Sequence, residues 1–214
     1  MATLVFSHGF GVKSDARGMF TQIADALPQY NSVLFDYNTV LENGDIEVAS
    51  LNLQAMTLQQ KVDEQQGDVI IIAHSQGCIV TGMINLQNVK KVILLAPPVE
   101  MSVQRVVDKL MKKPGAEIDL GGISKLPRSD GTVTHISKEY IQSLGHVSPI
   151  DLYASIAQKT DTTIVRCIDD EVLGLTNVNE VARAKLIDMS ANHDFTDSAR
   201  TDLLDFLSTE LHKL

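Results

Sequence analysis

Six short apolar runs, separated by stretches with helical periodicity, constrain the fold of this chain more than any other feature. The runs are residues 4–7, 32–35, 69–73, 92–96, 163–168 and 184–189. Continuous apolar runs of this length are typical of parallel strands that are buried on both faces. Helices are expected at 16–27, 51–65, 76–86 and 196–212. This alternation predicts right-handed βαβ units and an α/β fold with a doubly wound, mostly parallel six-stranded sheet.

The one break in this rhythm, residues 97–158, predicts an insertion. A chain of 214 residues, 44% of them hydrophobic, can bury a full core but is short for two enzymatic domains, so we expect residues 1–214 to form a single domain. Within the insertion, helical pieces are expected at 101–111, 138–144 and 150–157, around a middle rich in Gly, Pro and Ser. The prediction is a helical cap or lid over the strand ends, with a plain surface excursion as the alternative.

Composition excludes several classes of partner. The formal net charge is -9 and the acidic residues are scattered, so no basic stripe suits a nucleic acid. No segment approaches the ~20 apolar residues of a membrane span, and residues 1–6 run straight into the first strand without a signal-peptide pattern. Cys78 and Cys167 lie in apolar surroundings, which suits reduced, buried thiols. We therefore expect a cytoplasmic protein with a small-molecule substrate.

The apolar run at 69–73 leads into Ala73-His74-Ser75-Gln76-Gly77. A serine at a sharp strand-to-helix turn projects its hydroxyl above the sheet, and small residues on either side let the backbone bend. Ser75 is therefore a candidate nucleophile, and the backbone amide of Gln76 can face the oxygen of the group that it attacks. The alternative is a serine that only caps the next helix.

Two other loops follow predicted strands and carry suitable groups. In His8-Gly9-Phe10-Gly11 the glycines allow a tight turn, and the amide of Phe10 could complete an oxyanion hole with that of Gln76. Without a ligand, this loop is only a glycine-rich turn. His193 follows the last strand, where its imidazole could take a proton from a serine and return it to a leaving group. Its alternative is a loop residue ahead of the last helix.

The strand at 163–168 ends in Asp169-Asp170-Glu171, where an acid could orient the imidazole. Asp170 is favoured, because this choice places one acidic side chain in the loop and returns Val172 to the core. Asp169 is the reserve candidate. Three adjacent acids are also typical of a solvated turn or a helix start.

The remaining histidines predict no further catalytic group. His74 is expected to be a packed or hydrogen-bonded neighbour of the serine, whereas His135 and His146 lie in the insertion and could touch substrate. No two histidines stand at ligand spacing on a recognisable helix. We therefore expect neither a metal nor another cofactor.

Together these motifs resemble those of the α/β-hydrolase family. His8-Gly9-Phe10-Gly11 is similar to its oxyanion loop, Ala73-His74-Ser75-Gln76-Gly77 to its nucleophile elbow, and His193-Asp194-Phe195 to its histidine loop. The chain order Ser, Asp, His also matches. The resemblance implies that Ser75 is the nucleophile, His193 the base, Asp170 the orienting acid, and the amides of Phe10 and Gln76 the oxyanion donors.

Three departures from the family pattern accompany the resemblance. Ala73 replaces the first glycine of the elbow, and residues 166–168 lack the usual glycine before the acid. The chain also begins directly at the strand that carries His8, so the antiparallel hairpin that opens many members is expected to be absent. This chain would then have a minimal version of the family's sheet, with six strands.

The function predicted is that of a serine hydrolase, carboxylesterase- or thioesterase-like, cleaving an ester or thioester through an acyl-enzyme with burst kinetics. The same fold and site also serve peptidase, C–C hydrolase and lyase chemistry. An alternative of another class is a catalytically idle scaffold that binds a ligand or a protein. A geometry in which neither Asp169 nor Asp170 reaches His193 would favour that scaffold.

Overall fold

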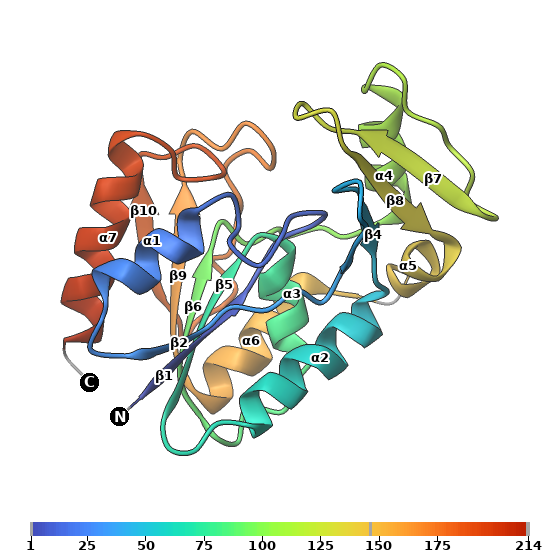
Figure 1. Ribbon diagram of the computed structural model, residues 1–214. Helices are drawn as coiled ribbons and strands as arrows, with labels where there is room; N and C mark the ends of the chain where they lie inside the picture. Colours follow the sequence, from blue (N-terminus) through green and yellow to red (C-terminus); the bar gives the residue numbers. More distant parts are fainter. Residues whose placement is uncertain (1, 146, 213–214) are drawn as a thin grey trace.

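The computed structural model describes residues 2–145 and 147–212, and its centre is a six-stranded sheet (Figure 1). In spatial order the strands are β10 (Lys185–Met189), β9 (Asp161–Cys167), β6 (Val89–Leu95), β5 (Val69–His74), β1 (Thr3–Ser7) and β2 (Asn31–Val33). Every pairing in this sheet is parallel. The predicted α/β class and six-stranded sheet are therefore confirmed, and all six strands present their carboxyl ends at one edge.

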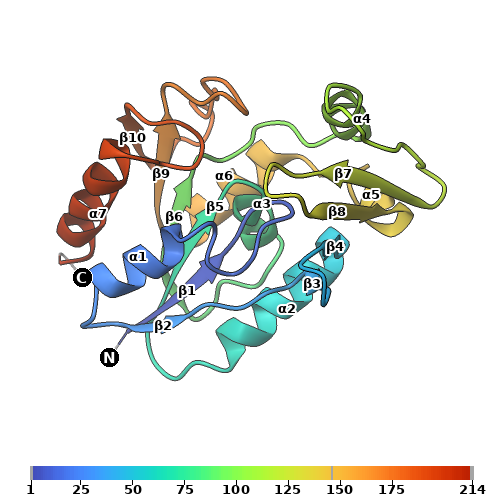
Figure 2. The same ribbon diagram turned by 45° about the horizontal axis from the view of Figure 1, so that its top comes forward.

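Helices cover both faces of this sheet (Figures 1 and 2). On one face lie α1 (Met19–Ala26) and α7 (Ser198–Leu211), and on the other α2 (Leu51–Asp63), α3 (Gln76–Gly82) and α6 (Pro149–Lys159). Successive strand residues point to opposite faces. In β5, Ile70 and Ile72 join the core beneath α1 and α7, whereas Ile71 and Ala73 join the core beneath the other three helices. The continuous apolar runs therefore fill two cores at once.

The first helix is shorter than the expected 16–27. It begins at Met19, because Ala16, Arg17 and Gly18 take left-handed backbone conformations with φ of 46°, 58° and 83°. A helix cannot propagate through such residues. The turn they form instead lies beside the carboxyl end of β1, on the edge of the cleft described below.

A second sheet lies beyond the carboxyl ends of the main strands (Figures 1 and 2). Its strands, in order, are β3 (Thr39–Val40), β4 (Ile46–Val48), β8 (Val133–Ser137) and β7 (Ile123–Pro127). The helices α4 (Val103–Met111) and α5 (Lys138–Ser143) accompany it. The helical pieces expected at 101–111 and 138–144 are thus present, and that at 150–157 is α6, which packs against α3 and β9.

The middle of the insertion, expected only as a stretch rich in Gly, Pro and Ser, forms strands. Residues 123–127 and 133–137 form an antiparallel hairpin, in which Ser124, Leu126, Thr134 and Ile136 are buried on one face. This alternation is the period-two signature of a strand, but neighbouring Gly and Pro residues obscured it. The hairpin also pairs in parallel with β4, which precedes the insertion in sequence.

Two expectations from composition can be compared with the structure. Among the helices of the described residues, none is both long and apolar enough to span a bilayer. Cys78 and Cys167 are both free and buried, as predicted. Burial raises the pKa of each thiol, so neither has the character of a reactive thiolate.

Candidate active site

Ser75 stands at the turn between β5 and α3 in a strained conformation, with φ 54° and ψ -125°. Such a backbone persists only where its surroundings hold it. The amide of Ser75 donates to the carbonyl oxygen of Leu95 on β6 at 2.9 Å, and Cys78 donates its amide back to the carbonyl of Ser75 at 3.0 Å. The turn therefore presents the serine hydroxyl above the carboxyl ends of the strands, as the sequence predicted.

Gly77 allows this turn to sit against β1. A Cβ at this position would lie 2.0 Å from the carbonyl oxygen of Ser7, which no side chain could avoid. Ala73, which stands where the family pattern has a glycine, is fully buried in β5 and accommodated without a bulge at that position. Of the two small residues flanking the elbow, only Gly77 has no room for a Cβ.

The structure brings Ser75, His193 and Asp170 together from three separate strand ends. Nε2 of His193 lies 3.0 Å from Oγ of Ser75, and Nδ1 of His193 lies 2.8 Å from Oδ2 of Asp170. His193 and Asp170 are each only 7% exposed. An ionised carboxylate can only accept, so Nδ1 carries a hydrogen and Nε2 accepts from the serine hydroxyl. This arrangement can move a proton from serine to histidine.

Asp170 is held as an anion by its surroundings. Its burial raises the pKa, but hydrogen bonds from His193 and from the amides of Leu173 and Val172, at 2.7 and 2.8 Å, outweigh burial and lower it. Asp169, the reserve candidate, is exposed and accepts from Oγ of Ser190 at 2.8 Å instead. Of the two aspartates, therefore, only Asp170 contacts the imidazole in the described structure. The expectation that Val172 would return to the core was wrong, since Val172 is 45% exposed.

The loop at residues 8–11 passes directly against the serine. A Cβ on Gly9 would lie 3.2 Å from Cβ of Ser75. The guanidinium of Arg128, from the second sheet, donates to the carbonyl oxygens of Phe10 and Gly11. Among the hydrogen bonds of the described residues, neither the amide of Phe10 nor that of Gln76 is used as a donor. Both amides are therefore available to a ligand oxygen beside Ser75.

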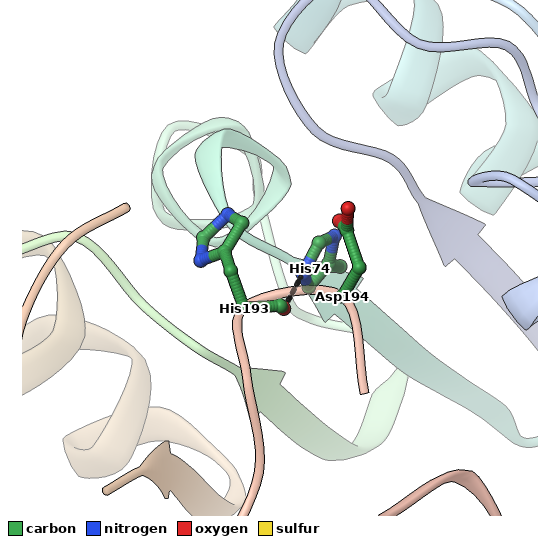
Figure 3. Close-up of side chains that lie close together, drawn as sticks. All are labelled: His74, His193 and Asp194. Carbon is green, nitrogen blue, oxygen red and sulfur yellow. Dashed lines mark hydrogen bonds between the residues drawn. The ribbon is translucent and has the colours of Figure 1, made fainter. Parts of the chain in front are cut away.

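His74 supports the site from behind, as predicted for a hydrogen-bonded neighbour. Its Nε2 donates to the main-chain carbonyl of His193 at 2.8 Å, the dashed line of Figure 3. Burial, followed by the charge of His193, lowers the pKa of His74 to about 4. Nδ1 of this neutral ring is buried and has no hydrogen-bond partner among the described residues.

His74, His193 and Asp194 also gather close enough to be considered as metal ligands, with one ligand atom of each within 4.8 Å of the others. Figure 3 shows the ring of His193 on one side and the other two side chains together. Both ring nitrogens of His193 already contact Asp170 and Ser75, and the carboxylate of Asp194 pairs with Arg17. To be bound by these three residues, a metal would have to break the contacts of His193 with Ser75 and Asp170 and the pair between Asp194 and Arg17.

Several residues that hold the site were not anticipated from the sequence. Glu171 accepts from the amide of His193 at 3.0 Å, and Arg200 donates to the carbonyl oxygens of Phe195 and Asp194, each at 2.9 Å. These contacts fix the path of the histidine loop. Polar side chains on a loop and a surface helix carry no spacing signal, so only the folded arrangement shows what they contact.

A buried polar chain fixes the side chain of Gln76. Its Oε1 accepts from the hydroxyl of Tyr140 at 2.5 Å, and its Nε2 donates to Oε1 of Gln54 at 2.8 Å. Gln54 in turn donates to the carbonyl of Ala49 at 2.6 Å. The first residue of α3 is thereby tied both to α2 and to α5 of the second sheet.

Two cavities meet at Ser75. One, of 130 Å³, is bounded by residues that include Gly9, Ser75 and His193. The other, of 720 Å³, reaches from Ser75 and Phe10 under α4 and the second sheet. Its walls include the apolar residues Met101, Val106, Leu110, Leu126, Ile136 and Tyr140, together with charged residues that include Lys109 and Lys112. An apolar group of a substrate could therefore lie beside the serine hydroxyl.

Of the two insertion histidines, His135 is placed by the structure away from the serine. Its Nε2 lies 3.0 Å from Oδ2 of Asp45, a contact that joins β8 to the turn between β3 and β4. His135 lines neither of the two cavities that contain Ser75, so the structure gives no support to the idea that it could touch substrate. His146 lies outside the described residues.

Comparison with known proteins gives one family match. The sequence pattern of the family described as serine hydrolase matches residues 8–123, a segment that contains both Phe10 and Ser75. No curated protein matches the chain in sequence.

Several solved structures share the fold at low sequence identity. A pyrethroid hydrolase from Sphingobium faniae JZ-2 is 13% identical, with 98% of this chain and 97% of that chain covered and a TM-score of 0.65. The esterase domain of a Rhodothermus marinus protein is 16% identical, with 99% and 87% covered and a TM-score of 0.65. A structure from a report on LipS and LipT, two metagenome-derived lipolytic enzymes, is 14% identical, with 100% and 94% covered and a TM-score of 0.71.

Proposed function

The chain belongs to the serine hydrolase family and has an α/β-hydrolase fold, and we propose that it cleaves an ester or thioester through an acyl-enzyme. The observation that carries the proposal is the line of contacts from Asp170 through His193 to Ser75, at 2.8 and 3.0 Å. An idle scaffold would be favoured if no acid reached the imidazole. Asp170 does reach it, which supports the enzyme.

In the proposed first step, Oγ of Ser75 bonds to the carbonyl carbon of the substrate and its proton passes to Nε2 of His193. The carbonyl oxygen becomes an oxyanion, which the amides of Phe10 and Gln76 stabilise. A single donor of this kind typically lowers the barrier by about 2.7–4 kcal/mol. The tetrahedral intermediate then expels the alcohol or thiol, which takes the proton from His193.

In the second step, water attacks the carbonyl carbon of the acyl-enzyme while His193 accepts its proton. The bond between this carbon and Oγ of Ser75 then breaks, Oγ takes the proton back from His193, and the carboxylic acid leaves. The carboxylate of Asp170 keeps the proton on Nδ1 and stabilises the imidazolium in both steps. The second sheet with α4, as a cap, supplies the apolar cavity of 720 Å³ for one side of the substrate. The names of the similar structures, an esterase and lipolytic enzymes among them, support a carboxylic ester as the bond cleaved.

The proposal is tested by intact-mass spectrometry after exposure to a fluorophosphonate. We expect a single adduct on Ser75, absent from both Ser75→Ala and His193→Ala. Ser190→Ala, which removes an exposed serine near the histidine loop, is the matched control and should label fully. Turnover of p-nitrophenyl butyrate should follow the same pattern, with an initial burst. Labelling or turnover that survives in Ser75→Ala would remove this residue from the mechanism.

A further inference from the structure

A strongly basic cavity of 510 Å³ lies beside the candidate active site. Its lining includes six basic residues but only two carboxylates, Asp15 and Asp130. The basic residues are Lys13, Arg17, Lys109, Lys112, Lys113 and Arg128. They are six of only 18 Lys and Arg residues in a chain whose net charge is -9. Positive charge is therefore concentrated at this cavity, although the chain as a whole is acidic.

This cavity is linked to the serine by shared walls. Arg17, Lys109 and Arg128 line both the basic cavity and the 130 Å³ cavity that contains Ser75 and His193. Two carboxylates, Glu171 and Asp194, also line the smaller cavity. Glu171 accepts from the amide of His193, and Asp194 pairs with Arg17. Asp194 is thus paired with a cation and Glu171 with a backbone amide, and the three shared basic residues join the smaller cavity to the basic cavity.

Most of the basic groups have no counter-ion. In the part of the chain that the structure describes, no carboxylate pairs with Lys13, Lys109, Lys112 or Lys113. The guanidinium of Arg128 donates to the neutral carbonyls of Phe10 and Gly11.

The pKa of Lys109 is lowered by its surroundings, which include other positive charges. Partial desolvation, followed by the charges of Arg128 and Arg17, lowers its pKa to about 8. Like charges held together in this way attract an anion that would neutralise them.

We infer that the basic cavity binds a phosphate-like anion carried by the leaving group of the substrate. This rests on the proposed function. The leaving group must reach Nε2 of His193 to take its proton, and His193 lines the smaller cavity, whose basic wall continues into the basic cavity. The acyl group then occupies the larger cavity, whose lining is mainly apolar but shares Lys109 and Lys112 with the basic cavity. Four lysines that have no carboxylate partner among the described residues exceed the need of a single carboxylate and suit a dianion.

The test compares two esters that differ only in a phosphate: 1-butyrylglycerol and 1-butyrylglycerol 3-phosphate. We expect kcat/KM to be at least about tenfold higher for the phosphorylated ester at low ionic strength. The preference should shrink as salt is raised from about 20 mM to about 0.5 M, because exposed charges are screened. Inorganic phosphate should compete with hydrolysis of the neutral ester.

Two double variants locate the effect. Lys112→Gln with Lys113→Gln removes two exposed cavity lysines, and should lower the ratio of kcat/KM between the phosphorylated and neutral esters several-fold. Lys61→Gln with Lys90→Gln changes the net charge equally but lies outside the cavity, and should leave the ratio as it was. Matching melting temperatures would show that both variants are folded.

The outcomes separate the two proposals. Hydrolysis of the neutral ester without a preference for the phosphorylated one would overturn the anion site and leave the esterase intact. A preference that falls equally in both double variants would also overturn it, because the effect would then be one of net charge. Failure of both esters, with no fluorophosphonate adduct on Ser75, would instead overturn the proposed function and this inference with it.

Discussion

His74 Nε2 donates a hydrogen bond to the carbonyl oxygen of His193 at 2.8 Å, so one histidine holds the backbone of the other. The bond requires the hydrogen on Nε2, and the ring is buried, with no partner for its Nδ1 among the described residues. Protonation would place a charge in this buried position next to His193. Because charging the buried ring is unfavourable, the pKa of His74 is lowered to about 4.

We expect this histidine to make stability pH-dependent. The unfolded chain takes up its proton near pH 6.5 and the folded chain only near pH 4, so unfolding binds protons between these values. The free energy of unfolding should fall by about 3 kcal/mol as the pH drops through this window. His74→Gln retains a donor but does not titrate. Urea titrations at several pH values should therefore show a free energy of unfolding that depends less on pH in this variant. An unchanged slope would assign the dependence to other groups.

Asp170→Asn should lower kcat by about 10³–10⁴, because an amide no longer fixes the hydrogen on Nδ1 of His193. The neighbouring Asp169→Asn is the matched control, since Asp169 is exposed and bonds Ser190. Its kcat should remain within about twofold. The measurement is p-nitrophenyl butyrate hydrolysis by both variants. Equal losses in the two would refute the choice of Asp170.

Gly77→Ala should prevent the elbow from forming, because its Cβ would overlap the carbonyl oxygen of Ser7 at 2.0 Å. Backbone must move to relieve such an overlap, and we expect a loss above about 3 kcal/mol of unfolding free energy. Gly121→Ala is the control, since its Cβ would meet nothing closer than 3.6 Å. Thermal unfolding of the two proteins decides the matter. A stable Gly77→Ala protein would mean that α3 can shift from β1.

Lys91→Met should destabilise the fold by about 3 kcal/mol, because Lys91 is 3% exposed and pairs with Glu210 at 3.0 Å and with Asp161 at 2.5 Å. The adjacent Lys90→Met removes an exposed pair with Asp68 and should cost less than about 1 kcal/mol. Chemical denaturation of both variants measures the difference. Similar losses would show that the buried pair is no stronger than the surface pair.

The same ion pair predicts acid sensitivity. Burial raises the pKa of Glu210, but hydrogen bonds from Lys185 and Lys91 outweigh it and lower the pKa from 4.5 to about 2. A depressed pKa contributes stability above about pH 4.5 that is lost as the pH falls towards 2. Glu210→Gln should remove this component from acid-unfolding curves. If the acid transition were unmoved, other carboxylates would account for it.

The main sheet was predictable because its strands are apolar on both faces and separated by helices. The run at 69–73, for example, falls within β5. The second sheet was not, because its strands are short and half-exposed, and β4 pairs with a partner more than eighty residues away. Pairings of that kind leave no local pattern in the sequence.

The candidate site likewise contains residues that were predictable from the sequence and residues that were not. Ser75, Asp170 and His193 each follow a strand, so a parallel sheet brings them to one edge wherever they stand in the chain. The contacts of Glu171 and Gln54 depend on side-chain directions that only folding sets. His135 illustrates the opposite error, since its place in the insertion suggested substrate but its imidazole bonds Asp45.

The parallel pairing of β4 with β8 has a consequence for protein engineering. The second sheet takes strands from before the elbow, at Ile46–Val48, and from after it, at Val133–Ser137. A graft that exchanged only the segment after the elbow with that of another hydrolase would leave β4 without its neighbour. Transplanting substrate preference into this scaffold therefore requires both segments to be moved together.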